Sequence, residues 1–235
     1  MNILLTNDDG YNSYGILLLK KLLSKYGKVV IIAPDSPRSG HSASLTLGQP
    51  IKYNQIDEDT FSSSGTPVDC VSFGLSSLNI KFDLVVSGCN DGYNISYDTM
   101  YSGTVGAALE SLIFRVPSIA ISTKRGDFSQ IEAHFDELWD FINKNDLFSV
   151  EHLLNINFPE TEFKGISLGK LYYRKDQNYF VKSNDGYLAY RYLEEDFKEK
   201  DTDCYQVEHG IISVVPLNKS YFNESLYEEM KRKVK

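Results

Sequence analysis

Short apolar runs that alternate with segments of helical periodicity limit most strongly what this chain can fold into. Asn2–Thr6 and Lys28–Ala33 read as strands that are apolar at consecutive positions, so both faces of each strand need cover. The segment between them, from Ser13 or Tyr14 to about Tyr26, carries apolar residues at the spacing of one helix face. Strands that are buried on both faces are typical of parallel sheets covered by helices.

The alternation continues over about the first two thirds of the chain. Further strands are expected at Asp83–Ser87, Ser118–Ser122 and Leu153–Asn157, and further helices at Ser102–Phe114 and Gln130–Asn143. This order of elements predicts an α/β fold with an open, mostly parallel sheet and right-handed crossovers.

The chain changes character after Pro159. Tyr and Phe become frequent, and strand-like stretches are expected at Tyr172–Tyr173, Tyr179–Val181 and Tyr187–Tyr192. A strand at Gly210–Pro216 and an amphipathic helix at about Asn223–Lys233 follow. We therefore expect a core over residues 1–158 and a β-rich extension over 159–235, the two forming one structural unit. Two strands alone are marginal in water, so an aromatic hairpin here is expected to pack against another subunit.

Composition and charge exclude several classes of protein. The net charge of −8 argues against the broad basic face that binds a nucleic-acid backbone. No apolar run is long enough for a signal peptide or a membrane span. The three cysteines are scattered without a CxxC pair, so neither a disulfide framework nor a thiolate zinc site is indicated. We expect a cytoplasmic protein with reduced thiols and no membrane partner.

Small polar loops follow three of the predicted strands. In open α/β sheets ligands bind outside the carboxyl ends of the strands, so these loops are the candidates for a site. They are Asn7–Gly10, the stretch from Ala33 to Ser44, and Gly88–Asn94, and a fourth polar stretch, Tyr101–Thr104, opens a helix. No GxGxxG, GxxxxGK[ST] or GxSxG motif is present, which disfavours dinucleotide redox chemistry, nucleoside-triphosphate motors and a serine hydrolase elbow.

The adjacent carboxylates Asp8 and Asp9 point to a hard cation. One Asp after a strand is an ordinary turn former, but two adjacent like charges repel each other, and a cation relieves that repulsion. Oxygen ligands suit Mg²⁺ or Mn²⁺. Ser39 offers a hydroxyl oxygen and Asn90 a carbonyl oxygen, although each also fits a plain loop. His41 lies in a polar loop, where a lone His is usually only solvated.

The start of the helix at Ser102 resembles an anion site. Ser102 is a good N-cap, and Gly103 and Thr104 offer backbone N–H groups, which attract an anion at a helix N-terminus. A plain cap is compatible with the same residues. Together these loops predict a hard-metal site beside a phosphate site.

Five ordered motifs closely resemble the survival protein SurE family. They are ILLTNDDG, APDSPRSGHSASLTL, GTPVDCV, VVSGCNDGYN and YSGTVGAALE, and a weaker likeness continues through TDCYQVEHGIISVVPL. The resemblance implies a Rossmann-like, three-layer α/β fold. It also implies a metal-dependent phosphatase that hydrolyses nucleoside 5′- and 3′-monophosphates, and dimers or tetramers that exchange a C-terminal hairpin.

The resemblance also assigns roles to residues. It implies one divalent ion per subunit bound by Asp8, Asp9, Ser39 and Asn90, with Asp8, Asp9 and Asn90 catalytic. It implies a phosphate site lined by Asn94, Ser102, Gly103 and Thr104. Two positions depart from the family pattern. Cys89 is expected to be a small buried hydrophobe. Asp91 adds a carboxylate that would either tighten metal binding or repel an anionic substrate.

Two other functions stay open on the sequence alone. An Asp nucleophile could form an aspartyl-phosphate, although such phosphatases carry DxD and not adjacent carboxylates. A metal- or nucleotide-binding regulatory module without turnover is the second alternative. For the hydrolytic mechanism, Asp8 and Asp9 are equal candidates for orienting or deprotonating the attacking water.

Overall fold

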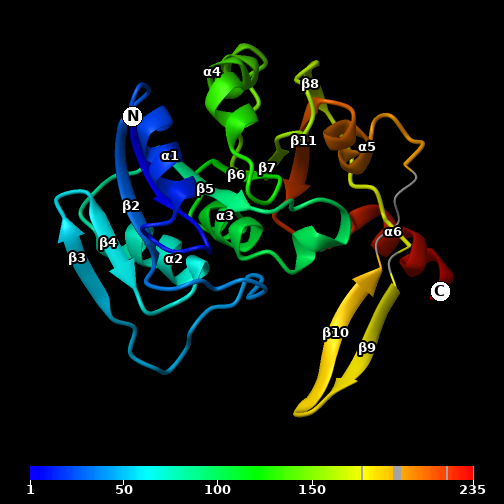
Figure 1. Ribbon diagram of the computed structural model, residues 1–235, viewed down its shortest axis with the longest axis horizontal. Coiled ribbons are helices and arrows are strands. Elements are labelled where there is room, and N and C mark those ends of the chain that lie inside the picture. Colours follow the sequence, from blue (N-terminus) through cyan, green and yellow to red (C-terminus); the bar gives the residue numbers. More distant parts are fainter. Residues whose placement is uncertain (176, 193–196, 221, 235) are drawn as a thin grey trace.

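The computed structural model describes residues 1–175, 177–192, 197–220 and 222–234, and Figure 1 shows their arrangement. The strands are β1 Asn2–Thr6, β2 Lys28–Pro34, β3 Tyr53–Asp57, β4 Thr60–Ser63, β5 Leu84–Asp91, β6 Ser118–Thr123, β7 His152–Asn157, β8 Gly165–Leu168, β9 Gln177–Ser183, β10 Gly186–Tyr192 and β11 Ile211–Asn218. The helices are α1 Tyr14–Leu23, α2 Pro67–Ser77, the 3₁₀ helix η1 Ser96–Met100, α3 Gly103–Ile113, α4 Ser129–Lys144, α5 Asp203–Glu208 and α6 Glu224–Lys233.

A nine-stranded sheet forms the centre of the molecule, in the order β3-β4-β2-β1-β5-β6-β7-β11-β8. The six strands from β4 to β7 in this order are parallel to one another; β3 is antiparallel to β4, and β11 is antiparallel to β7. The predicted α/β fold with a mostly parallel sheet is therefore confirmed. The chain leaves β1 toward β2 on one side and later builds β5, β6 and β7 on the other. The strand order thus reverses at β1 and β5, the position where such sheets bind ligands.

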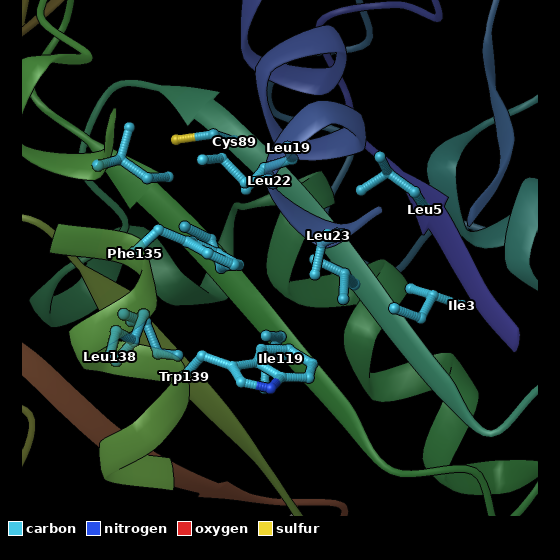
Figure 2. Packing of buried hydrophobic residues seen from close by; sticks show 14 of the residues in the cluster. Ile3, Leu5, Leu19, Leu22, Leu23, Cys89, Ile119, Phe135, Leu138 and Trp139 are labelled. Atoms are coloured by element: carbon cyan, nitrogen blue, oxygen red, sulfur yellow. The ribbon is translucent and has the colours of Figure 1, made fainter. Parts of the chain in front are cut away.

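Two helical layers cover the sheet, and the alternation of side chains along β1 shows why. Ile3 and Leu5 lie in the core formed with α1 and α4, whereas Leu4 packs into the opposite core, formed with α2. Figure 2 shows the first of these cores, where Leu19 of α1 and Phe135 of α4 meet the sheet. Apolar runs that are buried on both faces thus became the central parallel strands, as predicted.

Several predicted boundaries differ from the structure. α1 ends at Leu23 and not near Tyr26, because the Ser24 hydroxyl and N–H both bond to the Lys20 carbonyl and close the last turn. β5 runs on past Ser87 to Asp91. The predicted strand at Tyr172–Tyr173 is wrong: the Tyr172 N–H donates to the Asp203 carboxylate and not to a neighbouring strand.

The sequence analysis also missed α2, β3, β4, β8 and α5. For α2 a signal was present. Thr66 accepts a hydrogen bond from the Asp69 N–H, the Asp69 side chain accepts one from the Thr66 N–H, and Pro67 occupies the first turn. This capping box with a proline is a recognised helix start.

The C-terminal part contributes both to the central sheet and to a separate hairpin. β8 and β11 extend the central sheet, so the sheet crosses the boundary expected at residue 158. β9 and β10 form the separate two-stranded hairpin, which projects away from the rest of the chain in Figure 1. The predicted final helix is present as α6, but none of its described side chains is buried. The extension also contains residues 176, 193–196, 221 and 235, which lie outside the described residues.

Within the described ranges, no helix has the length and apolar character needed to cross a membrane.

Candidate active site

A pocket of about 260 Å³ lies at the carboxyl ends of the central strands, at the switch point of the sheet. It is lined by Asp8, Asp9, Ser39, Gly40, Asn90, Asp91, Gly92, Tyr93, Asn94, Asp98, Tyr101, Ser102 and Arg125. Six of the eight predicted site residues are therefore brought together from four separate segments. The other two, Gly103 and Thr104, contact Asp8 at the start of α3.

The turn after β1 is fixed by the side chain of Asn7. Its Nδ2 donates to the Gly10 carbonyl at 3.0 Å and to the Ser13 hydroxyl at 2.7 Å, while its Oδ1 accepts from the Gly10 N–H at 3.1 Å. Gly10 has a φ of +109°, which a residue with a Cβ rarely adopts. The Asn7 side chain thus fixes the turn without using the side chains of Asp8 and Asp9. Both carboxylates are left to line the pocket at the sheet edge.

Asp8 lies against the start of α3 and is almost fully buried, with 4% of its surface exposed. The Thr104 hydroxyl donates to its Oδ1 at 2.6 Å, and a Cβ on Gly103 would lie 3.1 Å from the Asp8 Cβ. Burial raises the pKa of Asp8 to about 6, and the charge of Asp9 adds to this rise, while the Thr104 hydrogen bond opposes it. Burial therefore makes the charged form of the Asp8 carboxylate less favourable, and a bound cation would offset this desolvation.

Asp9 lies beside a second carboxylate. Its Oδ2 accepts from the Asp91 N–H at 3.2 Å. Burial is the largest cause of its raised pKa; the charge of Asp91 raises the pKa further, and Arg125 lowers it. Two neighbouring, half-buried carboxylates make an electronegative site of the kind that divalent cations occupy.

The loop that carries Ser39 is held against β1 and α3. The Arg38 N–H donates to the Asp8 carbonyl at 2.7 Å, and the Ser42 hydroxyl donates to the Met100 carbonyl at 2.7 Å. A Cβ on Gly106 would lie 2.6 Å from the Ser42 carbonyl oxygen, so the loop packs directly on the helix backbone. These contacts bring the exposed Ser39 to the pocket, as predicted.

Asn90 and Asn94 line the pocket from the end of β5 and from the loop after it. The Asn90 Nδ2 donates to the Gly92 carbonyl at 2.7 Å, which leaves Oδ1 as the side-chain atom suited to a cation. The Asn94 Nδ2 donates to the Ser122 hydroxyl at 2.8 Å, and its backbone N–H donates to Asn157 Oδ1 at 2.9 Å. The Asn90 amide is thereby oriented by the loop after β5, and the Asn94 amide by β6.

Ser102 is the N-cap of α3, as expected. Its hydroxyl accepts from the Val105 N–H at 3.1 Å, so the side chain is engaged in the cap. The backbone N–H groups of the first turn remain as donors for an anion in the pocket. The Thr104 hydroxyl has a role beyond the predicted one of the backbone N–H, because it donates to Asp8 Oδ1.

The sequence reasoning missed Arg125, Asp98 and Tyr101, which also line the pocket. Arg125 follows β6, whose core had been predicted as a strand, so the polar residues after that strand belonged to the same edge of the sheet. Asp98 lies in η1 and forms an ion pair of 2.7 Å with Arg174, a buried residue of the C-terminal part. No sequence spacing indicated this long-range pair.

The donors fit a hard cation and not a soft one. Two carboxylates, one hydroxyl and one amide oxygen suit Mg²⁺ or Mn²⁺. In the described part of the chain, no group of three or more His, Cys, Asp or Glu side chains is placed to hold a metal ion. The oxygens of Ser39 and Asn90 would therefore have to complete any coordination by Asp8 and Asp9.

Comparisons with known proteins identify the family of this chain. Residues 3–178 match the family described as "Survival protein SurE". The chain is 38% identical to a protein named 5′-nucleotidase SurE from Actinobacillus succinogenes, over 92% of each chain. It is 45% identical to the one from Acinetobacter baylyi, over 68% of this chain and 66% of the relative. A crystal structure of a SurE protein from Aquifex aeolicus superposes with a TM-score of 0.86 at 34% identity, over the whole of both chains.

Proposed function

This chain belongs to the survival protein SurE family and is a 5′-nucleotidase, and we propose that it hydrolyses nucleoside 5′- and 3′-monophosphates with one divalent cation, Mg²⁺ or Mn²⁺. The main support for the metal is the convergence of Asp8, Asp9, Ser39 and Asn90 on one pocket beside the start of α3. This convergence supports a cation held by oxygen donors next to N–H groups that bind a phosphoryl group.

In the proposed reaction, Asp8, Asp9, Ser39 and Asn90 hold the cation. Once bound, the cation would neutralise phosphoryl oxygens and lower the pKa of an attacking water. The first-turn N–H groups of α3 and the side chain of Asn94 bind the non-bridging oxygens, and one of the two carboxylates accepts the proton of the water. Ser102 keeps the helix start in place as its cap, and Thr104 fixes the orientation of the Asp8 carboxylate.

A phosphate-release assay over a panel of nucleotides tests this proposal. Purified protein is assayed with 5′- and 3′-monophosphates under Mg²⁺, Mn²⁺ or chelator. We expect turnover of both ester types that chelation abolishes and added metal restores. Asp8→Asn and Asp9→Asn are expected to remain folded and to lose this activity. Wild-type turnover by both variants at saturating metal would show that the site is assigned wrongly.

The same assay separates the alternative reactions. Rapid quenching during turnover traps a phosphoenzyme if an Asp attacks the substrate directly, whereas water attack leaves none. Ligand binding without turnover, across all nucleotides and metals, would instead indicate a regulatory module. Neither outcome agrees with the proposed mechanism.

We also propose that the active form is a homodimer or homotetramer assembled through the C-terminal extension. The support is apolar surface: Phe180 and Tyr187 on the β9–β10 hairpin are 67% and 69% exposed, and Met230 on α6 is 56% exposed. Apolar patches of this kind usually mark an interaction site.

A cytoplasmic location is part of the proposal and is favoured by three free cysteines.

A further inference from the structure

The pocket carries far more negative than positive charge for a site that must bind an anion. Its lining contains the carboxylates of Asp8, Asp9, Asp91 and Asp98, and the guanidinium of Arg125 is the only cationic side chain in the described lining. A phosphate monoester is a dianion near neutral pH. Its binding therefore depends on how each of these carboxylates is neutralised.

Three of the four carboxylates have a counter-charge elsewhere. Asp8 and Asp9 face the proposed divalent cation. Asp98 pairs with Arg174 at 2.7 Å, and the side chain of Arg174 is 4% exposed, so this pair is fixed in the protein. Asp91 remains, and it lies next to Arg125 in the pocket lining.

Arg125 comes to the pocket on the short loop between β6 and α4, and Asp91 holds that loop. Asp91 Oδ1 accepts a 2.6 Å hydrogen bond from the N–H of Gly126, the residue directly after Arg125. Gly126 has a φ of +77°, so this backbone turn is one that glycine favours. Arg125 itself has no hydrogen bond or ion pair to any described residue.

We propose that Arg125 binds the phosphoryl group of the substrate, and that Asp91 is the positioning residue that holds the Arg125 loop over the pocket. This inference rests on the proposed function and deepens it. A guanidinium can donate two parallel hydrogen bonds to phosphate oxygens, which a lysine cannot reproduce. It also offsets the carboxylate that Asp91 adds to the site.

The sequence analysis considered two effects of Asp91, tighter metal binding and repulsion of an anionic substrate. Holding the Arg125 loop is a third role for Asp91. Its carboxylate contacts the Gly126 N–H and its own backbone N–H supports Asp9. Asp91 therefore links the two sides of the pocket, the carboxylates after β1 and the loop after β6. The charge of Asp91 does not repel the substrate, because the positively charged guanidinium of Arg125, which Asp91 positions, lies beside it.

Steady-state kinetics of Arg125→Gln tests the first part, with Lys124→Gln as the matched control. Lys124 precedes Arg125 in the same loop, pairs with Glu160 and does not line the pocket. We expect Arg125→Gln to raise KM for a nucleoside monophosphate by about tenfold to a hundredfold, the size of one lost hydrogen bond to a charged group. The control is expected to stay within about twofold of wild type.

The second part is tested by Asp91→Ala and Asp91→Asn. Asparagine keeps an oxygen that can accept from Gly126, so Asp91→Asn is expected to raise KM less than Asp91→Ala. In an Arg125→Gln background, Asp91→Ala is expected to add little to the rise, since the group that it positions is already gone. A merely structural role for Asp91 would instead raise KM by the same factor in both backgrounds.

Binding of inorganic phosphate by calorimetry, in the presence of Mn²⁺, keeps this test separate from the proposed function. If wild type turns over no nucleotide, the proposed function fails, but the phosphate affinity of wild type and Arg125→Gln still decides the role of Arg125. A loss of phosphate affinity confined to Arg125→Gln supports the inference. Equal KM and phosphate affinity in wild type, Arg125→Gln and Lys124→Gln would overturn it.

Discussion

The Thr104 hydroxyl donates a 2.6 Å hydrogen bond to Oδ1 of the buried Asp8, and so the second residue of α3 orients a carboxylate from the loop after β1. Thr104→Val keeps the shape of the side chain and removes this donor. We expect about tenfold lower kcat/KM or more, because a buried carboxylate loses one of its hydrogen bonds. Phosphate release measures the effect.

Thr104→Ser is the matched control, because serine retains the hydroxyl. We expect it to keep most of the activity that Thr104→Val loses. If the two variants lose activity equally, the methyl group and its packing matter, and not the hydrogen bond to Asp8.

Gly15 is expected to tolerate no side chain. A Cβ there would overlap the carbonyl oxygen of Cys89, so the start of α1 packs directly on the end of β5. Gly15→Ala should lower the free energy of unfolding by about 1–3 kcal/mol through overpacking. It should also reduce activity, because Asn90 follows Cys89 in the chain. Chemical denaturation and phosphate release measure the two effects.

Leu17→Ala serves as the comparison for Gly15→Ala. Leu17 lies in the same helix but is 50% exposed. Truncating its side chain should therefore lower the free energy of unfolding much less than truncating a core residue does. A Gly15→Ala variant as stable as Leu17→Ala would contradict the close packing described here.

The three cysteines are expected to be unreactive in the folded protein. Cys70, Cys89 and Cys204 are buried, and burial raises the pKa of each thiol, so the thiolate needed for reaction is absent at pH 8. A colorimetric thiol reagent should therefore react with none in native protein and with three after unfolding. Rapid labelling of a thiol before unfolding would disagree with the packing.

The stability of the protein should fall at alkaline pH, partly through Cys70. Burial raises the pKa of this thiol from 9.0 to about 12. The folded state therefore retains a proton that the unfolded chain releases, and stability present below about pH 9 is lost as the pH rises toward 12. Cys70→Ser, which has no group titrating in this range, should show a flatter decline in melting temperature above pH 9. Parallel declines in both proteins would exclude this contribution.

The oligomeric state should depend on the hairpin. Phe180→Ser and Tyr187→Ser remove exposed apolar side chains from β9 and β10, and the pair should shift the species seen by light scattering toward the monomer. Ile113, 74% exposed and outside the C-terminal extension, offers Ile113→Ser as a control. A wild-type mass equal to that of one chain at micromolar concentration would rule out the proposed assembly.

Sequence periodicity predicted the strands that are buried on both faces, because such strands leave a local signal. Lys28–Ala33 became β2 with one additional residue, and Leu153–Asn157 became β7 in the same way. β3 gave no such signal: four of its five residues are exposed, so neither an apolar run nor a regular alternation marks it. Its place at the sheet edge follows from pairing with β4 and not from its own composition.

The residues of the candidate site likewise include some that the sequence could predict and some that it could not. Asp8 and Asp9 follow β1 and Asn90 lies at the end of β5, so all three could be predicted from the rule that ligands bind at carboxyl strand ends. Asp98 could not, because its partner Arg174 is 76 residues away and the pair exists only in the folded chain. The hydrogen bond from the Thr104 hydroxyl to Asp8 likewise depends on a side-chain rotamer, which no sequence pattern encodes.

The position of β11 has a consequence for the order in which the protein can fold during synthesis. β11 lies between β7 and β8 in the sheet, yet in the chain it follows β7 only after β8, the β9–β10 hairpin and α5. Until the ribosome has released this strand, β7 keeps one edge with unpaired backbone groups, which invites pairing with other nascent chains. A fragment released early would retain the residues of the pocket loops after β1, β2, β5 and β6 but would expose that edge. Prematurely terminated chains are therefore expected to aggregate rather than to accumulate as small active enzymes.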